Sequence, residues 1–466
     1  HHPKISRIWG SPGLTKSLPW CVWRLYLVWS IALAQSEATW LDSRKRLPPF
    51  EAARKKPGWV WTAYPTVGYD PNRGLGAAIQ ANISYNGPRE DSLFLSLPYR
   101  HFANVQVGLY QREVWYGRLG YEWLWPAGRP YRLMMRTEAR QDGQIQLWGT
   151  DASTLTYTLS TYAPDGRLLT YYQALQTPFL DSTGVLRTRE AFHRVRMTRV
   201  QVWLLGERLF AHGLLRLSMG LRYLYEKPAS LSDTPFRIGS QTTRQAPTLF
   251  DSLVRQNLSF PLLPAGARLF LGTALIWDTR DFEVDPHKGL LVEASQEVAP
   301  GRLICKTTLD LRAYLPLYEK PQALPRLTLA VHALLYSTYG RDVPLWDLYY
   351  TNSWADARRL EGLSGPNLLR GYRENRFISP FGQVYQAELR LMLLEKNILR
   401  QNFIGGLIAF VDAGTGANTP LAWSYPWKAN IGLGSRILWN LQTILRADAA
   451  YSPEGWQLIF TTRHTF

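Results

Sequence analysis

The side chains that most often carry chemistry are sparse in this 466-residue sequence and form no recognisable catalytic motif. A hydrolase or protease would need a serine or cysteine nucleophile beside a histidine, with a third group to orient the base. The histidines that such a site would draw on stand alone, at His101, His193, His212, His287, His332 and His464. The two cysteines, Cys21 and Cys305, define no disulfide framework. We therefore expect no enzyme activity, no cofactor and no metal site.

One charged string has residue types that could carry either chemistry or structure. Asp278, Arg280 and Asp281 lie within four residues of one another and are followed by Pro286 and Gly289. Carboxylates beside a guanidinium can act in acid–base chemistry, and they can equally form an ion pair that holds a hairpin in register. The string alone leaves both interpretations open.

The chain is strongly basic, with a formal net charge of +17. A basic balance raises the question of nucleic-acid binding. The sequence has no basic helix, zinc-ligand set or phosphate-binding glycine loop, and positive residues such as Arg436, Arg446 and Arg463 are scattered through strand-like segments. Arginines that line a lumen, and contact with anionic lipid headgroups, are the simpler explanations. We expect outer-membrane lipids as partners and no nucleic acid.

The elements that must position these side chains are predicted to be strands. Aromatic residues make up 13% of the chain, with 19 Trp and 25 Tyr, which favour membrane–water interfaces. Mean hydropathy is only −0.21, and after Trp40 there is no apolar run long enough for a membrane-spanning helix. Frequent prolines and glycines indicate many turns. This combination predicts an all-β, transmembrane antiparallel barrel of about sixteen strands over residues 58–466, in the outer membrane of a Gram-negative-type bacterium.

Alternation supports the barrel directly. In residues 383–393, 442–451 and 456–466, apolar side chains alternate with polar and charged ones, as expected between lipid and a polar lumen. In the last segment the expected lipid-facing side chains are Trp456, Leu458, Phe460 and Phe466.

The start of the chain is typical of an exported protein. Residues 22–34 contain Arg24, a short apolar core and an Ala-x-Ala ending, which predicts a signal peptide cleaved after Ala34, preceded by an upstream remnant. Residues 35–57 are charged and contain prolines, so we expect an unfolded or extended periplasmic tail.

Four short strings, in order along the chain, carry a family resemblance. They are 276–281 followed by Pro286 and Gly289, 362–365 followed by 369–372, 410–414, and 432–436 followed by the terminal Phe466. Together they resemble the BamA/TamA family, also known as the bacterial surface antigen domain. The resemblance covers residues 268–466, while residues 59–267 resemble the family only in their strand-like sequence pattern. The segment before Trp59 is too short for the family's periplasmic POTRA domains, so the chain resembles a POTRA-less member.

The resemblance implies roles for single residues. In the family, a loop tip folds back into the barrel and its arginine reaches acidic residues on the inner wall. Arg370 matches that arginine, Gly371 and Tyr372 complete the tip, and Glu388 and Asp412 match the wall acids. Alternation independently places both acids on the lumen face, where a carboxylate paired with a guanidinium avoids the cost of facing lipid. The alternative is an Arg370 that lies in a solvated loop.

The same resemblance favours a structural function for the charged string. Asp278, Arg280, Asp281 and Gly289 match the family's hairpin, which favours a register-fixing or rim ion pair, and Phe466 matches its C-terminal signal.

The function implied is insertion or assembly of other proteins in the outer membrane, at a weakly paired junction between the first and last strands. Client barrel proteins, and a periplasmic or lipoprotein partner, are the expected protein partners. The alternative is a passive pore, or a structural subunit of an outer-membrane complex. An open conducting lumen would favour the pore, and a lumen filled by residues 340–375 would favour assembly.

Overall fold

The computed structural model describes residues 40–466, except 71–72, 148–159, 163–167, 171–174, 176, 239–240, 256–265, 321, 342 and 419–425. The predicted upstream remnant and signal peptide, residues 1–34, lie outside the described residues. Among the helices of the described residues, none has the length and apolar character of a membrane span.

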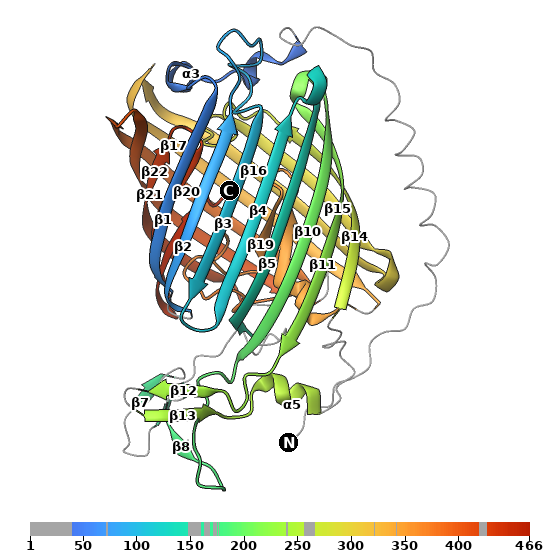
Figure 1. Ribbon diagram of the computed structural model, residues 1–466, viewed down its shortest axis with the longest axis vertical. Helices are drawn as coiled ribbons and strands as arrows, with labels where there is room; N and C mark the ends of the chain where they lie inside the picture. Colours follow the sequence, from blue (N-terminus) through green and yellow to red (C-terminus); the bar gives the residue numbers. More distant parts are fainter. Residues whose placement is uncertain are drawn as a thin grey trace. The chain divides into compact units, whose positions relative to one another are not determined.

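One antiparallel sheet of sixteen strands curls into a barrel (Figure 1), which confirms the predicted fold class. Each strand pairs with the next along the chain, apart from small strands in the loops. The barrel strands are β1 (Trp59–Asp70), β2 (Gly74–Tyr85), β3 (His101–Tyr110), β4 (Val114–Leu124), β5 (Tyr131–Gln146), β10 (Arg194–Phe210), β11 (Leu215–Ala229), β14 (Gly266–Asp278), β15 (Gly289–Ala299), β16 (Ile304–Lys320), β17 (Ala323–Gly340), β20 (Phe381–Ile398), β21 (Gln401–Ala417), β22 (Lys428–Trp439), β23 (Thr443–Ser452) and β24 (Gly455–Thr462).

Burial alternates along the barrel strands in the way that the sequence predicts. On β3 the outward residues Val105, Val107 and Leu109 are exposed, as expected for a surface that faces lipid. Inward residues such as Glu293 and Asp310 are buried and charged. The lumen is therefore a polar interior filled with ion pairs, enclosed by an apolar outer surface.

Connections differ between the two ends of the barrel. At one end, here called the α3 end, hairpin turns lie beside the short helix α3 (Pro49–Arg54). At the opposite end, here called the loop end, long insertions follow β5, β11 and β17. The insertions after β5 and β11 carry β6 (Ser160–Tyr162), β7 (Leu168–Thr170), β8 (Phe179–Leu180), β9 (Leu186–Thr188), β12 (Pro235–Ile238), β13 (Gln241–Gln245) and α5 (Leu249–Arg255). Strands β12, β13, β9 and β8 form one small sheet, which the sequence did not predict.

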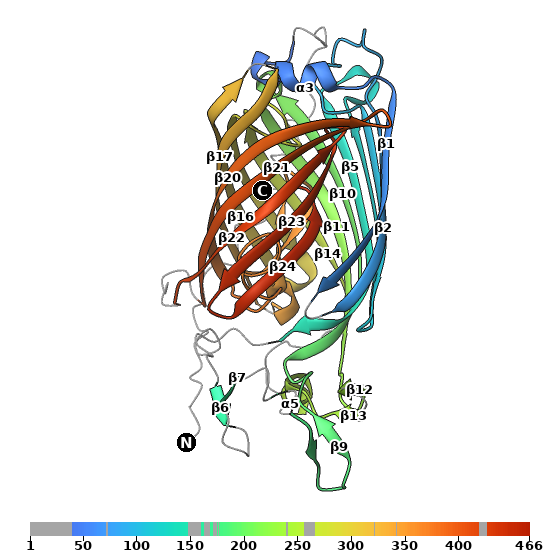
Figure 2. The same ribbon diagram turned by 90° about the vertical axis from the view of Figure 1, so that its left-hand side faces the viewer.

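The first and last barrel strands lie next to each other without a shared ladder. β1 and β24 approach each other near the α3 end and diverge toward the loop end (Figure 2), and the pairing among the described residues ends at β1 on one side and at β24 on the other. Side chains bridge the gap instead: the hydroxyls of Thr62 on β1 and Thr443 on β23 are 2.7 Å apart, and Asn82 donates to Thr443 at 2.7 Å. We call this junction the seam.

Residues 41–58 form an ordered cap at the α3 end, so the expectation of an unfolded or extended tail was wrong. The segment contains a 3-10 turn, Ser43–Lys45, and the helix α3, which starts on proline residues as helices often do. Leu47 and Phe50 are buried against the barrel rim in a cluster with Phe282, Met392, Ile404, Leu438, Leu441 and Ile444. Burial of these two side chains contributes to ordering the segment, together with ion pairs to the barrel rim, and charge and proline content alone do not reveal it.

Candidate functional site

The long insertion after β17, residues 341–380, folds back into the barrel. It carries a buried 3-10 turn, Leu345–Tyr349, and a small hairpin of β18 (Tyr350–Ser353) and β19 (Arg358–Glu361). Trp354 of this loop packs edge-on against Trp203 of β10, with ring centroids 5.4 Å apart. β19 is visible inside the barrel in Figure 1. We call residues 341–380 the lumen loop.

At the tip of the lumen loop, Arg370 is completely buried and meets carboxylates from three strands. Its Nε and Nη2 donate to the two oxygens of Asp412 on β21, at 2.9 and 2.6 Å. Its Nη1 donates to Glu388 on β20 at 2.6 Å and lies 3.4 Å from Asp448 on β23. The guanidinium also stacks 3.5 Å from the ring centre of Phe410. A fork-shaped cation that makes bidentate, charge-assisted bonds of this kind is held in one orientation.

The next two residues explain why the tip can approach the wall. A Cβ at Gly371 would lie 2.5 Å from Cβ of Asn430, which real side chains essentially never allow. The Gly371 carbonyl accepts a hydrogen bond of 2.6 Å from Ser452 on β23. Tyr372 donates to the carbonyl of Ala429 at 3.2 Å and packs edge-on against Phe377. Glycine is therefore required here for close contact between loop and wall.

The structure adds two partners of Arg370 that the sequence did not assign. Asp448 bridges Arg370 to the wall arginines Arg436 and Arg446, and the hydroxyl of Thr465 lies 3.2 Å from Arg370 Nη1. The alternation along residues 442–451 already placed Asp448 on the lumen face, so that signal was present. Alternation along residues 456–466 likewise placed Thr465 on the polar face, although in the structure it lies beyond the last strand.

The charged hairpin string lies at the α3 end and does not contact the Arg370 cluster. Asp278 is buried and pairs with Arg280 at 3.0 Å, with Arg216 at 3.2 Å and with Lys45 of the cap at 3.2 Å. One carboxylate oxygen of Asp281 accepts backbone N–H groups from residues 282, 287 and 288, which closes the turn.

Gly289 follows this turn at a φ of +111°, and a Cβ there would lie 2.3 Å from the Thr279 carbonyl oxygen. The left-handed backbone and the close approach both require glycine. The string therefore builds a rim hairpin to which the cap is bound. In the described part of the chain, no group of histidine, cysteine and acidic side chains is arranged to hold a metal ion.

The placement of Phe466 on the lipid-facing side of the last strand was wrong. β24 ends at Thr462, and Arg463 adopts a φ of +72°, which breaks the alternation and turns the chain into the lumen. Phe466 is only 4% exposed and packs with Tyr314 and Ala330, while its ring stacks on His332 with centroids 4.8 Å apart. The last three residues therefore cross to the opposite wall instead of extending the strand.

Comparison with known proteins gives two family matches, each over part of the chain. Residues 263–451 match the Omp85 superfamily domain, and residues 37–100 match a domain of unknown function, DUF5982. The first match contains Arg370, Glu388, Asp412 and the rim hairpin, and the second contains the cap together with β1 and β2. No curated protein sequence matches the chain.

Several solved outer-membrane structures are similar in a general way. BamA from Haemophilus ducreyi lacking POTRA domains 1–3 aligns with 13% identity over 87% of this chain and 70% of that chain, with a TM-score of 0.44. CdiB from Acinetobacter baumannii aligns with 11% identity over 91% and 71%, with a TM-score of 0.41. A bacterial polysaccharide outer membrane secretin aligns with 10% identity over 87% and 96%, with a TM-score of 0.36.

Proposed function

This chain belongs to the Omp85 superfamily and is a β-barrel protein of the Gram-negative outer membrane, and from that premise we propose that it assists the insertion or assembly of other proteins in that membrane. The superfamily match gives no indication of catalysis. The activity we propose needs neither a nucleophile nor a cofactor, because an incoming strand gains backbone hydrogen bonds from an unpaired strand edge.

The seam is the observation that carries this proposal. The barrel ladder ends at β1 and β24 among the described residues, so each presents an edge on which a client strand can form hydrogen bonds. β1 also contains Pro65, which lacks an N–H and is tolerated only where a strand is not fully paired. The inward turn at Arg463 shortens β24 at the α3 end of the seam. The two edge strands therefore separate at little energetic cost.

A passive pore is the main alternative, and the filled lumen argues against it. The lumen loop packs on the inner wall through Arg370, Trp354 and Tyr350, all of them buried. The cap lies across the α3 end and bonds to the rim through Lys45, Arg54 and Lys56. A role as a structural partner subunit is compatible with both features. Client proteins, surrounding lipids, and a periplasmic or lipoprotein partner are the partners that an assembly role requires.

A reversible lock of the seam tests the assembly function. In a background without native cysteines (Cys21→Ser and Cys305→Ser), we would introduce Thr62→Cys and Thr443→Cys, whose native hydroxyls are 2.7 Å apart. The readout is the rate at which an unrelated barrel protein folds into liposomes that contain the purified chain. We expect the oxidised protein to lose its acceleration of folding and the reduced protein to recover it.

The matched control is Ser295→Cys with Thr308→Cys, which joins directly paired residues of β15 and β16 away from the seam. This bond constrains strands that already share a ladder, so oxidation should leave the folding rate unchanged. If wild-type protein does not accelerate folding, or if both disulfides inhibit equally, assembly at the seam is wrong. The structural-subunit function then becomes the better explanation.

A further inference from the structure

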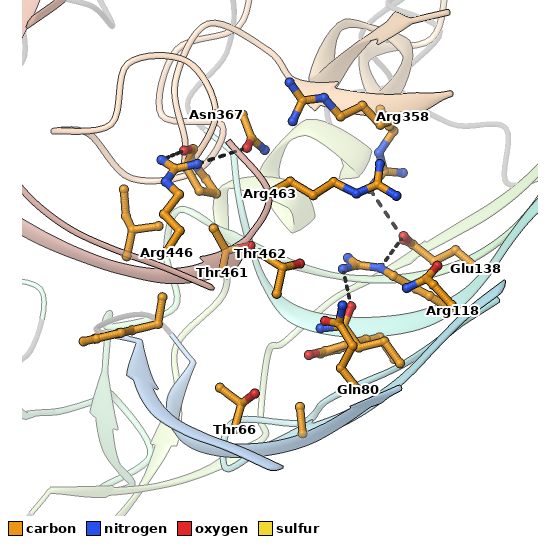
Figure 3. A pocket seen from close by; sticks show the side chains of 18 of the residues that line it. Thr66, Gln80, Arg118, Glu138, Arg358, Asn367, Arg446, Thr461, Thr462 and Arg463 are labelled. Carbon is orange, nitrogen blue, oxygen red and sulfur yellow. Dashed lines mark hydrogen bonds and ion pairs between the residues drawn. The ribbon is translucent and has the colours of Figure 1, made fainter. Parts of the chain in front are cut away.

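A cavity of about 640 Å³ remains inside the barrel, between the lumen loop and the wall on either side of the seam. Figure 3 shows it from close by, with Gln80 and Thr66 from the first hairpin on one side and Thr461 and Thr462 of β24 on another. The assembly function proposed above does not use this cavity. Its charge and its position indicate the kind of ligand that it could hold.

Cations outnumber anions on one wall of the cavity. Ten arginines and three carboxylates, Glu138, Glu361 and Glu374, border the cavity. Glu138 is shared by Arg118, with 2.9 Å between Nε and Oε2, and by Arg359 at 3.6 Å. Arg359 also keeps one buried guanidinium nitrogen, Nη1, without a hydrogen-bond partner in the described part of the chain. One carboxylate therefore serves two guanidinium groups, and part of their charge is left uncompensated.

Arg463 adds a third cation to the same wall. Its side chain points across the cavity toward Arg118 and Glu138 (Figure 3). Within the described residues its guanidinium has no ion-pair partner within 4.0 Å, although its backbone N–H is bonded to the Ile444 carbonyl at 3.0 Å. Arg463 follows the inward positions Gln457 and Thr461 in the alternation of β24, and its positive φ ends the strand. Clustered guanidinium groups with few acids attract an anion, and phosphate is the group whose geometry suits them best.

The cavity reaches the free edge of β24. It is bordered by inward residues of that strand, Gln457 and Thr461, and also by the outward residues Leu458 and Phe460, which are 53% and 56% exposed. Pro65, on the outward face of β1, borders it as well. Successive side chains of a strand point to opposite faces, so borders from both faces are expected where a cavity extends to an unpaired edge. The polar cavity is thus next to the lipid-facing surface at the seam.

A ligand that enters from this side passes the lipid-facing surface, so its anionic group should be attached to an apolar part. On the lipid-facing side of the seam, exposed apolar side chains come from both strands: Trp61 of β1, and Trp456, Leu458 and Phe460 of β24. An acyl chain would lie against these side chains while a phosphate enters between the strands. We propose that the cavity binds the phosphate headgroup of an anionic membrane lipid, which enters through the seam and is held by Arg463 together with Arg118 and Arg359. This proposal depends on the outer-membrane location and not on the assembly function.

The experiment compares lipid retention by native mass spectrometry of protein purified from vesicles of phosphatidylcholine and phosphatidylglycerol in equal amounts. Wild-type protein should retain phosphatidylglycerol in preference to phosphatidylcholine. In Arg463→Gln the preference should fall about tenfold, because one charge-assisted contact to phosphate is lost. Arg129→Gln, an exposed arginine in the turn between β4 and β5, makes the same change in net charge outside the cavity and should leave the preference unchanged. Heat-dependent mobility in detergent gels verifies that each variant is folded.

Two further arms identify the source of the phosphate. The Thr62→Cys, Thr443→Cys protein, oxidised in lipid-free detergent and then mixed with vesicles, should acquire less phosphatidylglycerol than its reduced form. Glycerol phosphate, which has the headgroup without acyl chains, should compete poorly. Equal retention by Arg463→Gln and wild type would overturn the site. Strong competition by glycerol phosphate with no effect of the disulfide would show a site for soluble anions and overturn the lipid assignment.

Discussion

At the scale of single residues, Arg370 is the side chain on which the interior depends most. Arg370 is completely buried, and Asp412, Glu388 and Asp448 share it as their cation. Burial of a charge is costly, so this cluster is favourable only while every member keeps its partners. Wall arginines partly compensate the acids: Arg390 donates to Glu388 at 2.8 Å, and Arg446 donates to Asp448 at 2.7 Å. Asp412 relies on Arg370 and on neutral donors, Gln386 and Asn430.

We therefore expect Arg370→Ala to destabilise the folded barrel by about 3–5 kcal/mol, the usual cost of leaving a buried acid without its cation. The lumen loop should also become sensitive to protease. The measurement is the thermal midpoint of heat-dependent gel mobility, with proteolysis at the temperature where wild type is intact. Arg341→Ala, at an exposed position of the same loop, is the control and should behave as wild type. Equal effects of the two substitutions would contradict a structural role for the Arg370 cluster.

At the scale of elements, the cap is held by two buried ion pairs, Lys45 with Asp278 and Glu51 with Arg326, and by contacts at its margin. Glu51 of α3 accepts from Arg326 of β17, and both side chains are buried. Arg54, at the end of the helix, forms a two-point contact with Glu395 at 2.7 and 2.6 Å. The helix is too short to be stable alone, so its order derives from these contacts and from Phe50.

Glu51→Ala should release the cap, because it removes the nearer carboxylate of the buried Arg326 and leaves only Asp285, 3.8 Å away. The expected result is rapid tryptic cleavage within residues 54–56, while the barrel itself resists digestion. Arg44→Ala removes a pair whose arginine side chain is 55% exposed, and such surface pairs contribute little, so that variant should be cleaved no faster than wild type. A Glu51→Ala cap that stays protected would show that Leu47 and Phe50 suffice to hold it.

Lys55 makes docking of the cap dependent on pH. Its Nζ is buried, donates to the Phe94 carbonyl, and donates to the Leu97 carbonyl at 2.6 Å. Burial lowers the pKa of this amine from 10.5 to about 7. An undocked cap keeps the ordinary pKa, so between pH 7 and 10.5 the docked form binds fewer protons. Docking should therefore strengthen as pH rises from about 7 toward 10 and change little below 7.

The measurement is the difference in thermal midpoint between wild type and Lys55→Met, in which a neutral side chain of similar length replaces the amine. We expect the thermal midpoint of wild type to rise relative to that of the variant as pH increases from 7 to 9.5. A difference that does not vary with pH would mean that the buried amine keeps its ordinary pKa.

At the scale of the whole molecule, two obstructions lie in series along the barrel axis. The cap covers the α3 end, and the lumen loop fills the interior toward the loop end. Because they use different contacts, removal of one should not remove the other. The seam is the remaining discontinuity in the wall, and it opens toward the membrane rather than along the barrel axis.

Conductance in planar bilayers tests this arrangement. Wild type and a deletion of residues 41–56 should both conduct poorly, since the lumen loop remains in place. Conductance should increase only when the deletion is combined with replacement of residues 343–379 by a short turn. Large, stable conductance in the wild-type protein would favour the passive pore over the function proposed here.

Local patterns in the sequence were enough to predict the barrel, its approximate strand number and the lumen side of its strands. Side chains of a strand alternate between its two faces with a period of two residues, which is visible in the sequence itself. The pattern is strong here because the outer face meets lipid and is apolar, while the inner face is polar and charged. The same period placed Glu388 and Asp412 on the inner wall, and the resemblance of residues 369–372 singled out Arg370 as a candidate to meet them. The structure then brings the three side chains together.

What the tertiary structure alone decided are contacts between segments far apart in the sequence. Glu51 pairs with Arg326, 275 positions later, and a polar segment rich in charge and proline gives no local sign that it will bury Phe50 on a barrel rim. The inward turn at Arg463 was equally hidden, because a non-glycine residue with positive φ has no sequence signature and the alternation continued through Phe466. Short-range periodicity reports which face a side chain occupies, whereas the partner it meets there depends on how the whole sheet curls and on what the loops fill.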